Sequence, residues 1–369
     1  MENWNKISFT ELISDRTKDG IKLPTNEYNQ SGLTAIIDQG QEFIAGYSDE
    51  TEGAFTDVPA IIFGDHTRVF KYVDFPFFLG ADGVKVLKAN QEINYKYLYY
   101  FFLQAKFPST GYARHFKWLK ELQIPLPPLE EQKHIAAVLD KCTALIAKHK
   151  LMLEKYDTLI KSRFIEMFGD PVQNPKKWDI KKMSDYILFL TSGSRGWSEY
   201  FSNEGELFLT IKNVKNNRIN IENIQYVQAP NNKEAERTKV QENDLLISIT
   251  ADLGRTGVVS KEIANYGAYI NQHLSLVRLN TEKVNPLFVS YYLETDGGKL
   301  QFNKKNQSAV KAGLNFEAIK SLTFMNPPLK KQNEFVSFVQ QIDKSKFVVQ
   351  KSLEKAETLY KSLMQEYFG

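Results

Sequence analysis

Apolar residues recur at alternating steps of three and four in two long stretches of the chain, each of which follows a Pro-Pro pair. This spacing, sustained over about four heptads, is typical of long helices that pair as a coiled coil. The expected seam between the two helices consists of Leu139, Ile146, Leu153, Ile160, Ile342, Val349, Leu353 and Leu363. Because Lys346 interrupts this seam, two ordinary amphipathic helices, each packed on its own domain, remain an alternative.

The two helical stretches belong to an internal repeat with an offset of 200 residues. Residues 153–169 and 353–369 are identical at ten of seventeen positions, whereas about one identity is expected by chance. The motif Pro-Pro-Leu-x-x-Gln recurs with the same offset at residues 127–132 and 327–332. Each helix therefore begins after a Pro pair and ends at Phe-Gly. We expect the two copies to lie antiparallel, each about 60 Å long.

The segments outside the helices show the pattern of mixed α/β domains. Short apolar runs, such as residues 60–63 and 244–249, predict buried strands. Each half also contains a later strand-like run followed by aromatic residues at helical spacing, in residues 93–100 and 284–291. The predicted fold class is α+β, with two mixed α/β domains in a pseudo-twofold repeat and two long antiparallel coiled-coil-like helices. The predicted boundaries are 1–126 for the first domain, 127–169 for the first helix, 170–326 for the second domain and 327–369 for the second helix.

Composition limits the classes of protein that need to be considered. A chain of 369 residues suits two to three domains, and 42% hydrophobic with 25% charged residues is typical of a globular protein. The net charge is only +3, so nucleic-acid binding would depend on local clusters of Lys and Arg. The single cysteine, Cys142, excludes a disulfide framework. The first residues lack a signal-peptide pattern and no apolar run approaches about 18 residues, so a cytoplasmic location is expected.

One motif suggests catalysis. Asn326-Pro327-Pro328-Leu329 resembles the Asn-Pro-Pro-aromatic motif of adenine methyltransferases, but Leu329 stands in place of the aromatic residue that stacks on the flipped base. The equivalent position in the first half is also a helix entrance, and no Gly-rich loop predicts a cofactor or nucleotide site. The five histidines lack the spacing of metal ligands. We therefore expect no catalytic residue, no metal and no cofactor in this chain.

Basic, amide and hydroxyl side chains gather in turns of both halves, where they could neutralise DNA phosphates and contact base edges. The candidate DNA-binding residues of the first half are His66, Thr67, Arg68, Lys71, Tyr112, Arg114, His115 and Lys117. Those of the second half are Ser194, Arg195, Trp197, Lys212, Arg255, Asn271, Gln272, His273, Lys304, Lys305, Asn306, Gln307 and Lys311. The alternatives are solvated charged loops and, for residues 271–273, the cap of a strand.

Four segments together resemble the specificity subunits of type I restriction-modification systems (HsdS). They are IPLPPLEEQKHIA (124–136), MFGDPVQNPKKW (167–178), ENDLLISITADLGRTGVV (242–259) and INQHLSLVRL (270–279). The resemblance extends over essentially the whole chain. Its departures are Lys330-Lys331 in place of an acidic pair, which alters the charge at the start of the second helix, and Asn-Pro-Pro in place of Leu-Pro-Pro.

The resemblance implies a non-catalytic subunit with two target-recognition domains, each of which reads one half of a bipartite, asymmetric site in double-stranded DNA. It also implies that two methyltransferase subunits dock on the helices and that two motor-endonuclease subunits join the complex, without any membrane association. S-adenosylmethionine, ATP and Mg would belong to those partner subunits. The rival interpretations are a DNA methyltransferase and a coiled-coil scaffold that binds only protein.

Overall fold

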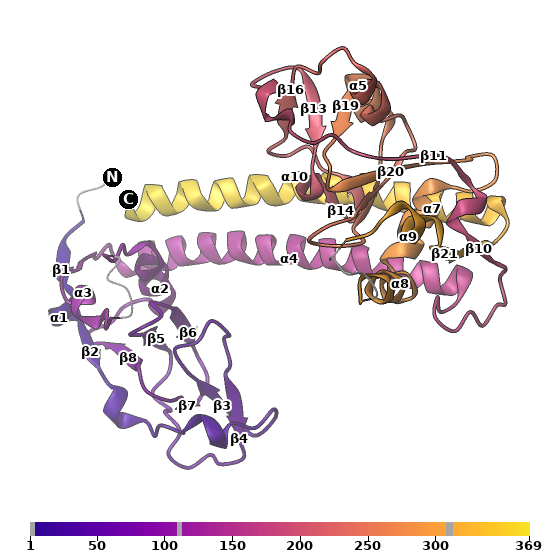
Figure 1. The fold of residues 1–369 in the computed structure, drawn as a ribbon. Coiled ribbons are helices and arrows are strands. Elements are labelled where there is room, and N and C mark those ends of the chain that lie inside the picture. Colours follow the sequence, from indigo (N-terminus) through magenta and orange to yellow (C-terminus); the bar gives the residue numbers. More distant parts are fainter. Residues whose placement is uncertain (1–3, 109–112, 308–312) are drawn as a thin grey trace. The chain divides into compact units, whose positions relative to one another are not determined.

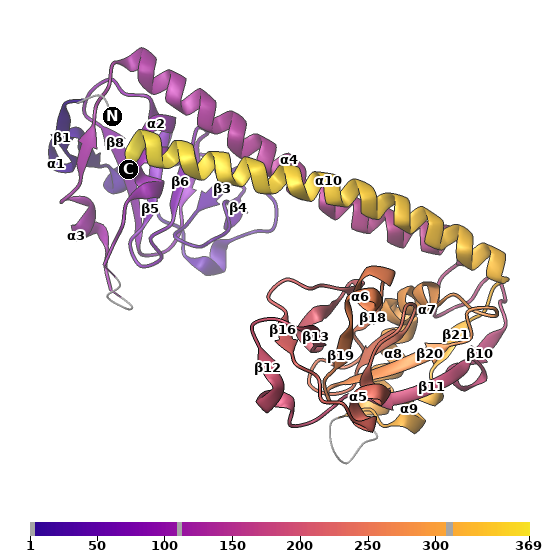
Figure 2. The same cartoon turned by 90° about the horizontal axis from the view of Figure 1, so that it is seen from above.

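The computed structural model describes residues 4–108, 113–307 and 313–369, and the chain forms two compact units. Unit 1 consists of Met1–Met152 and Val349–Gly369, and unit 2 of Leu153–Val348. Both units contain parts of two long helices, α4 (Leu129–Phe168) and α10 (Leu329–Phe368), which Figures 1 and 2 show as continuous. The compact units therefore divide both helices near their middle, whereas the predicted boundaries follow the helix ends.

The sequence at each end of α4 and α10 explains where the helices begin and end. Each begins directly after its Pro-Pro pair, because proline is tolerated at a helix start but not in a helix interior. After the last turn of α4, Gly169 has a φ of +84°, and its N–H donates to the carbonyl of Ile165 at 2.7 Å. A left-handed glycine that satisfies a carbonyl in this way is a common helix stop. Gly369 N–H likewise donates to Gln365 O at 3.0 Å.

Within each unit, α4 and α10 pack against each other in antiparallel directions. In unit 1, Leu139 of α4 and Met364 of α10 lie in one buried cluster, and further along Lys150 pairs with Glu357 at 3.2 Å. In unit 2, Phe164 of α4 contacts Phe335 of α10 edge-on, with ring centroids 5.4 Å apart. Of the predicted seam, Leu139, Ile160, Val349 and Leu353 are buried, and Ile146, Leu153, Ile342 and Leu363 are half-buried. The expected antiparallel pair is confirmed, and the alternative of two unpaired helices is wrong.

Lys346, the residue that interrupts the seam, has a partner on the facing helix. Its ammonium donates to the carboxylate of Asp157 at 2.5 Å, and both residues lie in unit 2. The aliphatic part of a lysine can pack along an apolar seam while its charged end reaches a carboxylate at the rim. The seam therefore tolerates this lysine without a break in the helix pair.

The glutamine of the repeated Pro-Pro-Leu-x-x-Gln motif joins each helix to its domain. Gln132 is buried; its Oε1 accepts from the backbone N–H of Asn94 at 2.9 Å, and its Nε2 donates to Pro127 O at 2.8 Å. Gln332 makes the same two bonds, with Asn285 N–H and Pro327 O. Since Asn94 and Asn285 cap the helices that follow the strands, one buried amide links two helix starts in each unit.

The described residues of unit 1 form three sheets. The four-stranded sheet has the order β2 (Ile13–Asp15), β8 (Val84–Ala89), β5 (Ala60–Gly64), β6 (Phe70–Val73), all antiparallel. A second sheet has β3 (Thr34–Ile37) between β4 (Gly46–Ser48) and β7 (Phe77–Leu79), and β3 runs parallel to β7. The ribbon β1 (Lys6–Ser8) with β9 (Gln123–Pro125) closes the domain. The helices are α1 (Phe9–Leu12), α2 (Tyr95–Gln104) and α3 (Phe116–Leu119).

Unit 2 follows the same plan with additional strands. Its main sheet has the order β11 (Ile187–Ser192), β20 (Leu274–Leu279), β17 (Leu245–Ser248), β18 (Thr256–Val258), β15 (Asn217–Ile219), β14 (Val214–Lys215). The second sheet has the order β12 (Phe201–Ser202), β16 (Gln225–Val227), β13 (Glu206–Leu209), β19 (Ala268–Ile270), and β10 (Ile180–Lys182) pairs with β21 (Thr323–Met325). The helices are α5 (Lys233–Thr238), α6 (Lys261–Tyr266), α7 (Pro286–Glu294), α8 (Asp296–Gln307) and α9 (Phe316–Lys320).

Two topological features are common to both units. The order β2-β8-β5-β6 corresponds to β11-β20-β17-β18, and the parallel pair β3/β7 corresponds to β13/β19. The predicted fold class, two mixed α/β domains with two long antiparallel helices, is therefore confirmed. In the described part of the chain, no helix has the length and apolar character needed to cross a membrane.

Candidate nucleic-acid interface

In each unit, two loops that carry or adjoin candidate residues leave one sheet edge together. Because β3 and β7 are parallel, the loops that follow them, residues 38–43 and 80–83, leave the sheet at the same edge. In unit 2, the loops after β13 and β19, residues 210–213 and 271–273, are placed in the same way. The edge of a parallel strand pair is a common place for ligand-binding loops.

In unit 1, Gln39 joins three of these loops. Its Nε2 donates to Asp82 O at 2.8 Å, and its Oε1 accepts from the backbone N–H of His66 at 3.2 Å. Thr67 in the same hairpin turn donates its hydroxyl to Gln39 O at 2.5 Å. Loops 38–43 and 80–83 and the turn between β5 and β6 therefore form one hydrogen-bonded surface. Of the predicted contacts here, His66 and Thr67 are half-buried, and Arg68 is exposed.

The predicted basic stretch at 112–117 attaches to the same turn through Asp65. The backbone N–H of His115 donates to Asp65 O at 2.9 Å, and the N–H of Phe116 donates to the Asp65 carboxylate at 2.7 Å. His115 is only 1% exposed, and its Nδ1 lies 3.0 Å from Asp65 O. The prediction of His115 as a DNA contact is thus corrected: the ring is packed inside and fixes the loop that presents the exposed Arg114 and Lys117.

Lys71 is also corrected from a surface contact to an internal support. It is 4% exposed, and its ammonium donates to Asp38 O at 2.8 Å and to Glu42 O at 2.6 Å. Burial lowers the pKa of Lys71, and the neighbouring Asp38 and Glu42 carboxylates oppose this shift. The lysine therefore anchors both ends of loop 38–43 from beneath.

Replacing Lys71 by methionine is expected to lower the free energy of unfolding of unit 1 by about 1–3 kcal/mol. Methionine fills similar space, but the carbonyls of Asp38 and Glu42 lose their donor. Urea unfolding followed by tryptophan fluorescence measures the change. Arg68→Ala is the matched control, because Arg68 is exposed on the same hairpin and its loss is expected to change stability by less than about 0.5 kcal/mol. Equal stability of the two variants would contradict the anchoring role.

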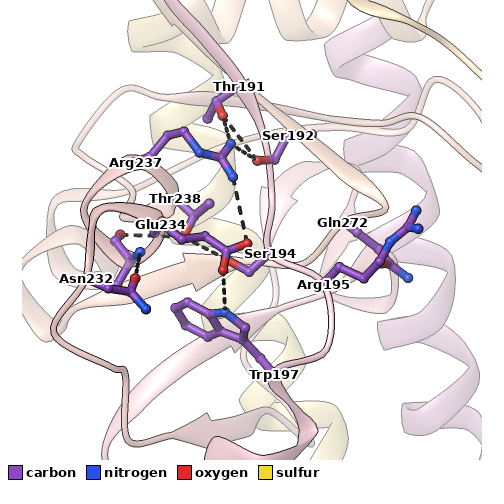
Figure 3. Close-up of polar contacts among 11 residues, drawn as sticks. Thr191, Ser192, Ser194, Arg195, Trp197, Asn232, Glu234, Arg237, Thr238 and Gln272 are labelled. Atoms are coloured by element: carbon purple, nitrogen blue, oxygen red, sulfur yellow. Dashed lines mark hydrogen bonds and ion pairs between the residues drawn. The ribbon is translucent and has the colours of Figure 1, made fainter.

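In unit 2, two predicted contacts are buried. Ser194 is 2% exposed, and its hydroxyl lies 3.1 Å from that of Thr238. Trp197 is 3% exposed, and its indole donates to Glu234 at 3.3 Å (Figure 3). The indole also stacks on Phe208. Both predictions are corrected, because small hydroxyl and aromatic side chains in a turn can support the turn from inside just as well as face a ligand.

Arg195, by contrast, points away from this buried group together with Gln272 (Figure 3). Its Nε donates to Gln272 Oε1 at 2.6 Å. Gln272 Nε2 lies 3.2 Å from His273 Nε2, and His273 Nδ1 lies 2.7 Å from the Thr250 hydroxyl. The structure thus brings together Arg195, Gln272 and His273, three of the predicted contacts. Asn271 has a local role instead, since its side chain accepts from His273 N–H at 3.1 Å within the turn.

The remaining candidates are distributed around the same loops and α8. Lys212 and Lys304 are exposed, and Asn306 is half-buried. Arg255 is half-buried and pairs with Asp252. Lys305 donates to the Ser321 hydroxyl at 2.5 Å. The backbone of Gln307 lies at the end of α8. Tyr112 and Lys311 lie outside the described residues. Nothing in the structure tests DNA contact by any of these residues, which stay predictions.

Asn326 is the first residue of the methyltransferase-like motif, and its side-chain oxygen and backbone N–H both make hydrogen bonds within the protein. Its Oδ1 accepts from Gln332 Nε2 at 3.1 Å, and its backbone N–H donates to Asp179 O at 2.8 Å. The amide oxygen that would bind a flipped base thus holds the entrance of α10. Within residues 4–108, 113–307 and 313–369, no group of three His, Cys, Asp or Glu side chains is placed to hold a metal ion.

The sequence interpretation missed Gln39 and Thr250, which join the loops of unit 1 and unit 2, respectively. A positional signal was present in both cases. Gln39 lies two residues after the buried strand β3, and Thr250 two residues after the buried strand β17. Polar residues that follow a buried strand are candidates for a site at the sheet edge.

Two mixed domains of one plan, each with hydrogen-bonded loops at the edge of a parallel strand pair, define a duplicated two-domain protein. The sequence matches the family described as "Type I restriction modification DNA specificity domain" over residues 1–155 and 175–357. The chain belongs to this family, which confirms the resemblance found in the sequence.

Curated relatives and a solved structure agree with this assignment. The chain is 28% identical to the putative type I restriction enzyme MjaX specificity subunit of Methanocaldococcus jannaschii over 67% of this chain and 58% of that protein. It is 22% identical to the type I restriction enzyme EcoBI specificity subunit of Escherichia coli over 68% of this chain and 58% of that protein. The matched region thus spans less than two thirds of either relative. The S subunit of a type I system from M. genitalium has a similar fold, with a TM-score of 0.68, 16% identity and coverage of 100% of this chain and 96% of that one.

Proposed function

We propose that this chain is the DNA-recognition subunit of a type I restriction-modification complex, and that each mixed domain reads one half of a bipartite, asymmetric site. The observation that carries the proposal is the hydrogen-bonded set of loops at the edge of the parallel strand pair in each unit. Exposed basic residues there, such as Arg68, Arg114 and Arg195, suit phosphate and base contacts. The loops differ between the units while the helix ends repeat, which supports two different half-sites on one framework.

The helices provide the second part of the proposal. They dock two methyltransferase subunits and set the spacing between the half-sites, and two motor-endonuclease subunits join the complex in the cytoplasm. Leu145 and Leu151 of α4 and Leu359 of α10 are 45%, 49% and 52% exposed, and exposed large apolar side chains on helices favour protein docking. S-adenosylmethionine, ATP and Mg belong to those partners, and this chain is non-catalytic.

The test combines this chain with its cognate methyltransferase subunit and S-adenosylmethionine on a randomised DNA library, and the methylated adenines are sequenced. We expect one bipartite motif with a fixed spacer. The methyltransferase subunit alone is the control and is expected to show no sequence preference. Methyl transfer by this chain alone, or methylation without a motif in the complex, would refute the proposal.

A further inference from the structure

We propose that Arg195 reads a guanine in the half-site of unit 2. The inference rests on the proposed function and adds to it the identity of one base and the group that selects it. It follows from how the backbone of Arg195 is fixed, from what holds its guanidinium, and from how Arg195 differs from the other arginines of the unit.

The backbone directly before Arg195 is joined to the neighbouring loop by two hydrogen bonds of Ser194. Ser194 N–H donates to Ile270 O at 2.9 Å, and Gln272 N–H donates to Ser194 O at 2.9 Å. A Cβ on Gly193 would lie within 2.1 Å of Asn271 O, so only glycine allows this close approach. The side chain of Arg195 is thus exposed, while the residue before it is buried and hydrogen-bonded (Figure 3).

The guanidinium is oriented by a chain of hydrogen-bonded side chains. Gln272 Oε1 accepts from Arg195 Nε at 2.6 Å, so the Nε2 group of the same amide must face His273. His273 Nε2 then accepts from that amide, and its Nδ1–H donates to the Thr250 hydroxyl at 2.7 Å. Every member has a consistent donor or acceptor role. The arrangement fixes the Nε edge of Arg195 and leaves Nη1 and Nη2 without a hydrogen-bond partner among the described residues.

Arg195 differs in this respect from the other arginines of unit 2. Of six arginines there, all within the described residues, five lie within 4 Å of a carboxylate. These five are Arg163, Arg218, Arg237, Arg255 and Arg278. A neighbouring carboxylate neutralises part of an arginine's charge, whereas the uncharged amide of Gln272 leaves the charge of Arg195 in place.

These properties match a guanine edge in the major groove. Guanine presents O6 and N7 as two adjacent acceptors, and the two terminal nitrogens of an arginine can donate to both at once. A phosphate accepts hydrogen bonds from several directions and carries no sequence information, whereas a bidentate contact to a guanine edge requires the guanidinium to lie in the plane of that base. The fixed backbone of Arg195 and its hydrogen bond to Gln272 therefore favour a contact with a nucleobase. The Arg195 side chain has lost most of its rotational freedom before DNA binds.

The experiment uses the complex of the full chain with its cognate methyltransferase subunit, and it sequences the methylated sites of a randomised library. We expect the wild-type motif to contain a guanine, on either strand, in one half-site. Arg195→Ala is expected to lower the preference at that position by about 5- to 150-fold, while the other half-site stays unchanged. Unchanged preferences at the other positions of the same half-site show that unit 2 of the variant is folded. Gln272→Met, which keeps the size but removes the acceptor, is expected to reduce the same preference to a smaller extent.

Lys212→Ala is the matched control, because Lys212 is an exposed cation of the same loop edge. It is expected to weaken methylation of all sequences alike without a change in base preference, as for the loss of a phosphate contact. The same uniform loss for Arg195→Ala, or a wild-type motif without guanine at the affected position, overturns the inference. These results leave the proposed function intact, whereas a wild-type complex without any motif refutes both.

Discussion

Replacing Asp244 by alanine is expected to lower the free energy of unfolding of unit 2 by about 3 kcal/mol, because it removes one partner of a buried ion pair. Asp244 is fully buried, and its two oxygens accept from Nε and Nη2 of Arg278, each at 2.8 Å. The same carboxylate also accepts from the backbone N–H of Gln241 at 2.7 Å. The Arg278 side chain is 25% exposed, so water reduces part of the cost of leaving it unpaired.

Urea unfolding, followed by tryptophan fluorescence, measures this change against a matched ion pair of the same domain. Asp252 and Arg255 also pair, but their side chains are 55% and 40% exposed. Asp252→Ala is therefore expected to cost less than about 1 kcal/mol. A loss for Asp244→Ala no greater than that for Asp252→Ala would show that burial does not make the Asp244–Arg278 pair important.

The same ion pair shows what a sequence pattern can and cannot predict in this protein. The apolar run of residues 244–249 correctly indicates a buried strand, because strand patterns depend on neighbouring residues. The partner Arg278 lies on β20, and only the antiparallel register in which Leu245 faces Val277 brings the two charges together. That register depends on packing between distant segments, which alternation within one segment does not determine.

The long helices were the most predictable part, because their signal is repeated. The shared motif, the Pro-Pro starts and the Phe-Gly ends placed α4 and α10 within two residues of the predicted ranges 127–169 and 327–369. Lys346, which interrupts the apolar seam, donates to the carboxylate of Asp157 on the facing helix. A repeated, heptad-spaced pattern leaves few alternative structures.

The candidate site was predictable at the level of loops but not of side chains. Lys71 and His115 have the residue types of DNA contacts, yet they support loops from inside. Arg195 and Arg68 have the same character in the sequence and are exposed. A charged residue in a turn can face either direction, and its direction depends on carbonyls supplied by other loops, such as those of Asp38 and Glu42 for Lys71.

Deleting one heptad from both helices is expected to shorten the spacer between the two half-sites by about three base pairs. Seven residues of helix correspond to about 10 Å, and base pairs are stacked about 3.4 Å apart. Suitable segments are residues 151–157 of α4 and 346–352 of α10, because these remove Asp157 and Lys346 together and leave neither charge unpaired. A full heptad also keeps the apolar seam on the same face of each helix.

The measurement is the sequencing of sites methylated by the complex in a library that contains every spacer length. Each half-site sequence is expected to stay the same, since the loops at the sheet edges are untouched. Three base pairs turn B-DNA by about 100°, whereas a heptad deletion turns a helix by only about 20°, so the DNA must twist and methylation at the new spacing will be weaker. Deletion of residues 151–157 alone is the control: it puts the seams of α4 and α10 out of register, leaves Lys346 without Asp157, and is expected to destabilise the protein. An unchanged spacer in the double deletion would contradict the role of the helices in setting the distance, because the same two domains would then select it by other means.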